Sequence, residues 1–318
     1  MERIDAYTHI LTEPFYDELT ANYEFHGLSG SPAWLWDVDR RLSDMAEFGI
    51  DRQVITLALP QLWRGMDPEA ALPLVRFAND ELRRLADDHP AAFIPVGTLP
   101  FATEAYLDEF DRCVDDLELA GVQIFSNVDG APIDIGFDGV FERADAHDVP
   151  LWLHPQIYPW YDWASEYMEH RLFGWPFDTT LALSRLVFTG VTSRYDFDLI
   201  AHHGGGMVPF YGRRIDMFYR TRLAYPENYD VELPTFDPSP VDHFRRFAAD
   251  TALDGSTAAL HCARSFFDDG RLVFGSDYPF GPGRGRAKVE SMIEAIDRAG
   301  LLEAIQERLY AENLRELL

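Results

Sequence analysis

Short apolar segments alternate with amphipathic helical patterns along all 318 residues, and this alternation constrains the fold more than any other feature. The segments expected to form strands are residues 3–8, 53–58, 92–99, 121–125, 150–154, 197–202, 246–251 and 271–275. Strands joined through helices run parallel, so eight such units predict an α/β protein with a single domain over residues 1–318, a (β/α)8 TIM barrel. A doubly wound sheet is the alternative, but no GxGxxG turn follows the first strand.

The composition is strongly acidic, with 54 Asp and Glu against 27 Lys and Arg and a formal net charge of -27. Lys288 is the only lysine, and the acidic residues are spread along the chain, which is typical of a solvated surface. Such a surface repels nucleic acid and anionic lipid, so we expect neither nucleic acid nor membrane as a partner. Salt screens self-repulsion over a Debye length of roughly 3 Å near 1 M, so the charge predicts a halophilic source.

The sequence also bears on the compartment. No apolar stretch is long enough to span a membrane, and no signal-peptide core separates Met1 from the first expected strand. Two cysteines, Cys113 and Cys262, are too few for a disulfide framework. We therefore expect a cytoplasmic enzyme.

Polar residues recur where the expected strands end, and in a barrel these ends meet at one mouth. They are Tyr7, His9, His154, His202, His203 and Asp277. One buried histidine is usually a hydrogen-bonded core residue, and one aspartate after a strand is often a helix cap. Histidines and an aspartate on four separate strands instead indicate a divalent-metal site, because burying so many titratable groups together is costly without a common purpose.

The adjacent histidines cannot both face the mouth in the same way, because neighbours on a strand alternate. The glycines that follow let the backbone turn tightly and approach a ligand. We therefore expect His203 to be functional and His202 to be a structural or supporting residue.

Several motifs resemble the amidohydrolase superfamily, and within it the group typified by aminocarboxymuconate-semialdehyde decarboxylase. The strand-six motif of that group is similar to HHGGGMVPFYGRRI at residues 202–215. Further similar segments follow the family's order along most of the chain: WDVDRRLSDMAEFGI, GVQI, LHP, FDTTLALSRLVFTGV and GSDYPFG.

The resemblance implies a metal-dependent carboxy-lyase with His9, His154 and Asp277 as ligands, and zinc, or else manganese, as the ion. It implies catalytic roles for His203, which would orient or deprotonate water at the metal, and for Asp277. The implied substrate is a small-molecule carboxylate that Arg41 and Arg214 bind. We also expect substrate contacts from Trp36 and from Arg171, which lies near where the family carries an aromatic residue over the substrate. In the family the arginine matching Arg214 serves the neighbouring subunit's site, so a homodimer is implied. The aromatic loop at residues 154–176 is expected to cover the mouth or to form a wall against a planar substrate.

Tyr7 departs from the family, which usually has histidine, and in some decarboxylases glutamate, as the first ligand. A phenol has a pKa near 10 and ligates only if a metal lowers that value strongly. Tyr7 can therefore ligate as phenolate or stand aside from three other ligands, and its presence can also mark loss of the metal. The alternatives to a decarboxylase are a hydrolase of an amide, lactone or C–N bond, a hydratase, and a catalytically silent ligand-binding barrel.

Overall fold

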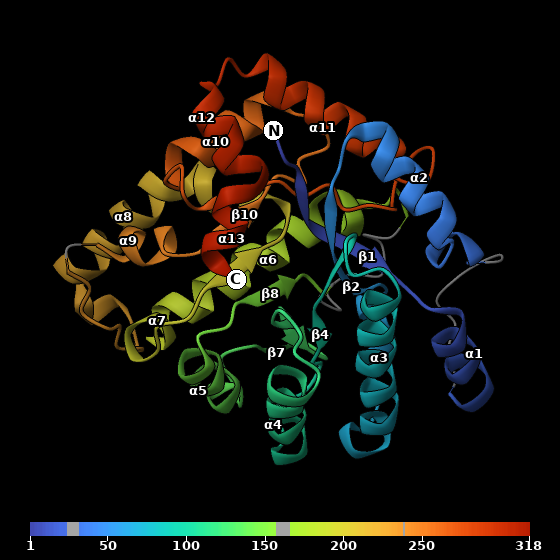
Figure 1. The fold of residues 1–318 in the computed structure, drawn as a ribbon. Helices are drawn as coiled ribbons and strands as arrows, with labels where there is room; N and C mark the ends of the chain where they lie inside the picture. The colour runs from blue at the N-terminus through green and yellow to red at the C-terminus, as the bar shows by residue number, and fades with distance from the viewer. Residues whose placement is uncertain (24–31, 157–165, 238) are drawn as a thin grey trace.

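The expected strands form the wall of a barrel in the computed structural model (Figure 1), which describes residues 1–318 except 24–31, 157–165 and 238. The barrel strands are β1 Ile4–Ile10, β2 Arg52–Leu57, β3 Phe93–Pro95, β4 Gly97–Thr98, β5 Val122–Phe125, β8 Leu151–His154, β9 Leu199–Ala201, β10 Ala248–Asp250 and β11 Leu272–Val273. They pair in parallel in the orders β1-β2-β3 and β11-β10-β9-β8-β5-β4.

The two ladders join into a closed barrel. Only Val96 separates β3 from β4, so together they form one barrel strand. On the other side, the Ala6 N–H donates to the Phe274 carbonyl at 2.7 Å, and Thr8 bridges to Tyr278. The (β/α)8 prediction is thereby confirmed. A short hairpin of β6 Asn127–Val128 and β7 Ala131–Pro132 was not expected from the sequence.

Helices surround the wall (Figure 1). They are α1 Glu13–Asn22, α2 Val38–Phe48, α3 Pro68–Asp88, α4 Glu104–Asp111, α5 Asp138–His147, α6 Trp175–Phe188, α7 Val191–Arg194, α8 Val208–Ala224, α9 Pro240–Arg245, α10 Thr257–Phe266, α11 Arg286–Arg298, α12 Glu303–Glu307 and α13 Asn313–Leu317. Side-chain caps begin several of them; Asp37, for example, accepts from the Arg40 N–H at 3.0 Å. No helix in the described part of the chain is both long and apolar enough to cross a bilayer.

The core has two parts, because each barrel strand is covered on both faces. Inside the barrel, Ile4, Val54, Trp152 and Ile200 belong to one buried cluster. The Trp152 indole crosses this interior and donates to the Ala6 carbonyl at 2.9 Å. A larger cluster lies mainly between the wall and the helices. The polar strand ends therefore lie next to a largely apolar barrel interior.

Candidate metal centre

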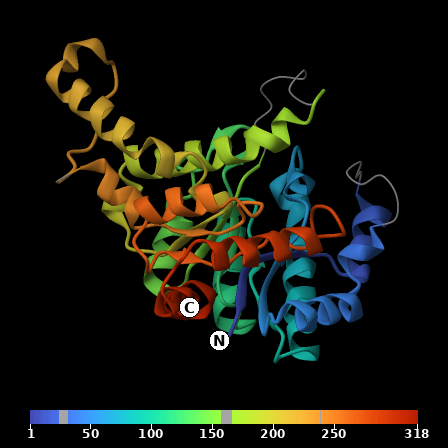
Figure 2. The same ribbon diagram turned by 90° about the horizontal axis from the view of Figure 1, so that it is seen from above.

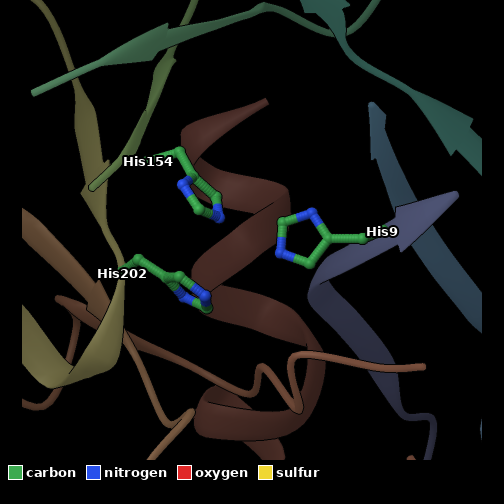
Figure 3. Close-up of side chains that lie close together, drawn as sticks. All are labelled: His9, His154 and His202. Carbon is green, nitrogen blue, oxygen red and sulfur yellow. The ribbon is translucent and has the colours of Figure 1, made fainter. Parts of the chain in front are cut away.

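Three histidines from different strands point toward one another in the barrel (Figure 3). His9 lies near the end of β1, His154 ends β8, and His202 directly follows β9. The ring centroids are 5.0 Å apart for His9 and His154, 5.3 Å for His154 and His202, and 5.8 Å for His9 and His202. One nitrogen from each ring lies within 4.8 Å of the other two, which is close enough for a shared metal ion.

Asp277 adjoins this group. Its Oδ1 is 3.3 Å from His9 Nε2 and 3.6 Å from His202 Nε2. Its backbone holds a left-handed conformation, with φ of 62°, and donates its N–H to the Tyr7 carbonyl at 3.1 Å. This conformation is uncommon for a residue other than glycine and is maintained by the surrounding structure.

Hydrogen bonds fix which nitrogen of each histidine faces the centre. The Thr56 hydroxyl donates to the Thr8 carbonyl at 2.9 Å, so it accepts from His9 Nδ1, also at 2.9 Å. His154 Nδ1 donates to the Pro155 carbonyl at 2.8 Å. Burial lowers the pKa of both histidines, so each is neutral and turns the Nε2 lone pair inward.

His202 is held differently, by a carboxylate. Its Nδ1 donates to Asp250, which ends β10 and also accepts from the backbone N–H groups of Gly204 and Ala252, each at 3.1 Å. Burial disfavours the charged ring, but Asp250 and Asp277 outweigh it and raise the pKa of His202 to about 9. The hydrogen bond to Asp250 therefore fixes Nδ1 of His202, and Nε2 faces His9, His154 and Asp277.

The donor set fits a divalent metal ion. His9 Nε2, His202 Nε2 and Tyr7 Oη are buried and have no hydrogen-bond partner among the described residues. A buried polar atom left in that state costs about 1–3 kcal/mol, so three at one point indicate that they serve a ligand. Imidazole nitrogens together with one carboxylate are common ligands for divalent transition metals.

Tyr7 lies inside the same cluster. Its ring stacks on His202, with centroids 4.1 Å apart and planes inclined by 15°. Burial raises the pKa of its hydroxyl well above 10, so the phenol is neutral, with Gln123 as a polar neighbour. Its coordination of a metal stays a prediction.

The structure differs from the sequence interpretation at the histidine pair. His202 meets His9 and His154, whereas His203 starts a short turn with φ of 56° and stacks on Trp175 at 6.2 Å. His203 still lies with His202 and Asp277 in a second possible ligand group. His202 therefore has a more central place than expected, and the catalytic role of His203 stays a prediction.

The sequence interpretation also missed Asp250 and Lys288. Asp250 ends an expected strand, which is the same signal that identified Asp277, so it could have been found. Nothing in the sequence pattern connects Lys288 with Asp277, although the structure places their side chains in contact.

Arg41 lies beneath the site and is buried. Its guanidinium donates to Gln53 Oε1 at 2.9 Å, to Thr8 Oγ1 at 3.2 Å and to the His9 carbonyl. Burial lowers the pKa of Arg41 to about 10. These contacts support the backbone at His9, and a role of Arg41 toward a substrate carboxylate stays a prediction.

The other residues expected to bind substrate do not meet in the described structure. Arg214 is exposed on α8, where its guanidinium lies over the Phe218 ring at 4.5 Å. Arg171 is exposed on the turn His170–Gly174, and Trp36 packs against Tyr16 at 5.1 Å. Much of the expected aromatic wall, residues 157–165, lies outside the described residues. Aromatic rings nearer the centre are Phe280, 5.5 Å from His9, and Trp34, 5.7 Å from Phe280.

Comparison with known proteins identifies the family. The amidohydrolase family model matches residues 4–318, so this chain belongs to the amidohydrolase family. It is 29% identical over 286 residues to 2-amino-3-carboxymuconate-6-semialdehyde decarboxylase of Dictyostelium discoideum, covering 89% of this chain and 77% of that protein. It is 28% identical over 260 residues to gamma-resorcylate decarboxylase of a Polaromonas species, covering 76% of this chain and 77% of that protein.

Solved structures share the fold. The 5-carboxyvanillate decarboxylase of Novosphingobium aromaticivorans, in complex with manganese and 4-hydroxy-3-methoxy-5-nitrobenzoic acid, superposes with a TM-score of 0.85 at 21% identity. That match covers 99% of this chain and 95% of the other. A dihydroxybenzoic acid decarboxylase from a Polaromonas species, with bound manganese and 2-nitroresorcinol, gives a TM-score of 0.81 at 24% identity, covering 99% and 96%.

Proposed function

We propose that this protein is a metal-dependent decarboxylase acting on an unsaturated or aromatic carboxylic acid. The observation that carries the proposal is the convergence of buried, unpartnered histidine nitrogens on Asp277, in a family member whose curated relatives are decarboxylases. A divalent ion bound there supplies positive charge for the oxygens of a carboxylate substrate.

The proposed ligands are His9, His154 and Asp277, and Tyr7 does not coordinate the ion in this proposal. Zinc is the ion inferred from the sequence, and the manganese in related decarboxylase structures makes that ion the alternative. Imidazole suits zinc and carboxylate suits manganese, so this mixed set of ligands does not choose between the two ions. Metal analysis after supplementation with each ion tests this inference, and less than about a tenth of an equivalent of either would contradict it.

Decarboxylation breaks the bond between the carboxylate carbon and its neighbour, releases carbon dioxide and leaves an electron pair that must take up a proton. His202 and His203 are the two candidates to move that proton. Because His202 donates its Nδ1 hydrogen to Asp250, Nε2 is the atom of His202 that would gain or lose the transferred proton. His203 is favoured by the glycine motif, and its ring stacks on Trp175, which suits a site for a planar substrate.

Carbon dioxide release from a panel of hydroxybenzoates and muconate-type acids tests the proposal. We expect carbon dioxide release with at least one acid. Replacing the residue that moves the proton, by His202→Asn or by His203→Asn, should lower the rate of that release by about 10²- to 10⁴-fold. Cleavage of amides or lactones without carbon dioxide would support a hydrolase, and water addition would support a hydratase. Binding without turnover would support a silent ligand-binding barrel.

We also infer a homodimer in which Arg214 acts in the neighbouring subunit's site. In Figure 2, α8 projects from the body of the barrel, and it exposes Phe210, Met217 and Phe218. Exposed apolar side chains close together favour a protein interface. Mixing inactive His9→Ala and Arg214→Ala subunits tests this: restored activity is expected, because one mixed site then has every residue. A monomer at micromolar concentration would contradict it.

A halophilic source and a cytoplasmic location stay inferences from composition. The net charge of -27 predicts that molar KCl raises the midpoint of thermal unfolding, because salt screens repulsion between acidic side chains. An unchanged midpoint between low and molar KCl would contradict the halophilic inference.

A further inference from the structure

Asp277 has two carboxylate oxygens, and they face different partners. Oδ1 lies toward His9 at 3.3 Å and His202 at 3.6 Å. Oδ2 lies 2.6 Å from the ammonium of Lys288, near the start of α11. Among the described residues, Lys288 is the only lysine or arginine paired with Asp277.

The structure holds Lys288 in this position. Its side chain is 22% exposed, and its stem lies under Gly281, where an added Cβ would meet three stem carbons at 3.1 to 3.3 Å. Gly281 has φ of 101°, so both its backbone conformation and the closeness of the stem favour glycine there. Asp254, which is largely exposed, lies 3.1 Å from the same ammonium and balances its charge from the outer side.

We infer that Lys288 is a positioning residue for the metal centre, fixing Asp277 Oδ2 so that Oδ1 is presented to the ion between His9 and His202. A ligating carboxylate that is hydrogen-bonded from behind loses less side-chain freedom on binding, and loss of such outer partners typically weakens metal binding about 10- to 100-fold. The opposing effect is repulsion between ammonium and metal, which Asp254 reduces. The inference rests on the metal site of the proposed function, but not on its substrate.

Measurement of Mn²⁺ affinity by equilibrium dialysis of the metal-free protein tests this role apart from catalysis. Lys288→Met keeps most of the stem and removes the donor, and we expect its Kd to rise about 10- to 100-fold. Lys288→Gln keeps a hydrogen-bond donor, so its Kd for Mn²⁺ should rise less than that of Lys288→Met. Arg298→Met removes a positive charge from the exposed side of the same helix, where Arg298 pairs with Glu294, and should keep the wild-type Kd.

Thermal unfolding of each metal-free variant separates positioning from general support, because a merely structural ion pair would lower the midpoint without changing the Kd of the folded protein. A Kd for Lys288→Met within threefold of wild type, or tighter, would overturn the inference; tighter binding would show that the ammonium mainly repels the ion. If Lys288→Met does not fold, a Kd for Lys288→Gln that is no higher than the wild-type Kd would overturn the inference instead. If the wild-type protein binds no Mn²⁺ or Zn²⁺, the metal-dependent function and this inference both fail.

Discussion

Two buried polar clusters adjoin at the carboxyl ends of the barrel strands, and they differ in how completely their hydrogen bonds are made. In the first, Ser126, Asn127 and the Gln156 N–H all donate to one oxygen of Asp178, the latter two at 3.1 and 3.0 Å. In the second, the metal centre, three polar atoms have no partner within the described structure.

Both clusters are buried, but the Asp178 cluster is suited to support the fold, whereas the metal centre is suited to bind a ligand. A network in which the donors have an acceptor recovers part of the cost of burying its polar groups and stabilises one arrangement of the chain. A network that leaves buried polar atoms without hydrogen-bond partners recovers less of that cost until a ligand arrives. His154 and Gln156 are two residues apart, so a single stretch of chain serves both clusters.

The largest expected effect is in the metal centre. His9→Ala should weaken Mn²⁺ binding at least on the order of 100-fold and abolish decarboxylation, because it removes a proposed ligand. In a thermal-unfolding assay, Mn²⁺ at about 100 times its wild-type Kd should stabilise the wild-type protein by about 2.7 kcal/mol and the variant by no more than about 0.4 kcal/mol. His147→Ala, a partly exposed histidine paired with Asp111, is the matched control and should behave as wild type. Equal stabilisation of wild type and His9→Ala would remove the distinction between the clusters.

The second effect should appear in stability rather than activity. Asp178→Ala leaves the buried Ser126 hydroxyl without its acceptor and removes one acceptor of the Asn127 amide, and we expect a loss of about 3 kcal/mol in the free energy of unfolding. Denaturant unfolding of the metal-free protein measures it. Asp196→Ala, which removes an exposed partner of Arg246, should cost no more than about 1 kcal/mol. If the two variants lost the same amount, the Asp178 cluster would not have the structural role assigned to it.

Each expected strand has a counterpart in the structure, because parallel strands buried on both faces leave continuous apolar segments in the sequence. The strand ends also identified His9, His154 and Asp277. The structure gives His202 a more central place than the sequence interpretation did, because strand alternation does not reveal which neighbour points inward; that depends on where β9 stops and the turn begins. The contact of Lys288 with Asp277 depends on how α11 packs, which no local pattern encodes.

A pH measurement sharpens the comparison, because burial raises the pKa of Asp178 to about 6 despite the donors around it. The folded protein then binds this proton more tightly than the unfolded chain, so stability from this group is greatest below about pH 4 and is lost as pH rises through 6. Asp178→Asn keeps an acceptor and cannot ionise. The free-energy difference between variant and wild type should therefore shift in favour of the variant by on the order of 2 kcal/mol between pH 4 and 7. A pH-independent difference would show that this carboxyl has an ordinary pKa.

The smallest expected effect concerns Tyr7, the residue that departs from the family pattern. Tyr7→Phe keeps the ring that stacks on His202 and removes only the buried hydroxyl. If the phenol stands aside from the metal, the Mn²⁺ Kd should stay within about threefold of wild type, and the metal-free protein should gain up to about 1 kcal/mol, because an unpartnered polar atom is gone. A Kd raised more than tenfold would instead make Tyr7 a ligand. The hydroxyl would then be unpartnered for the same reason as His9 Nε2, because both atoms would be kept for one ion.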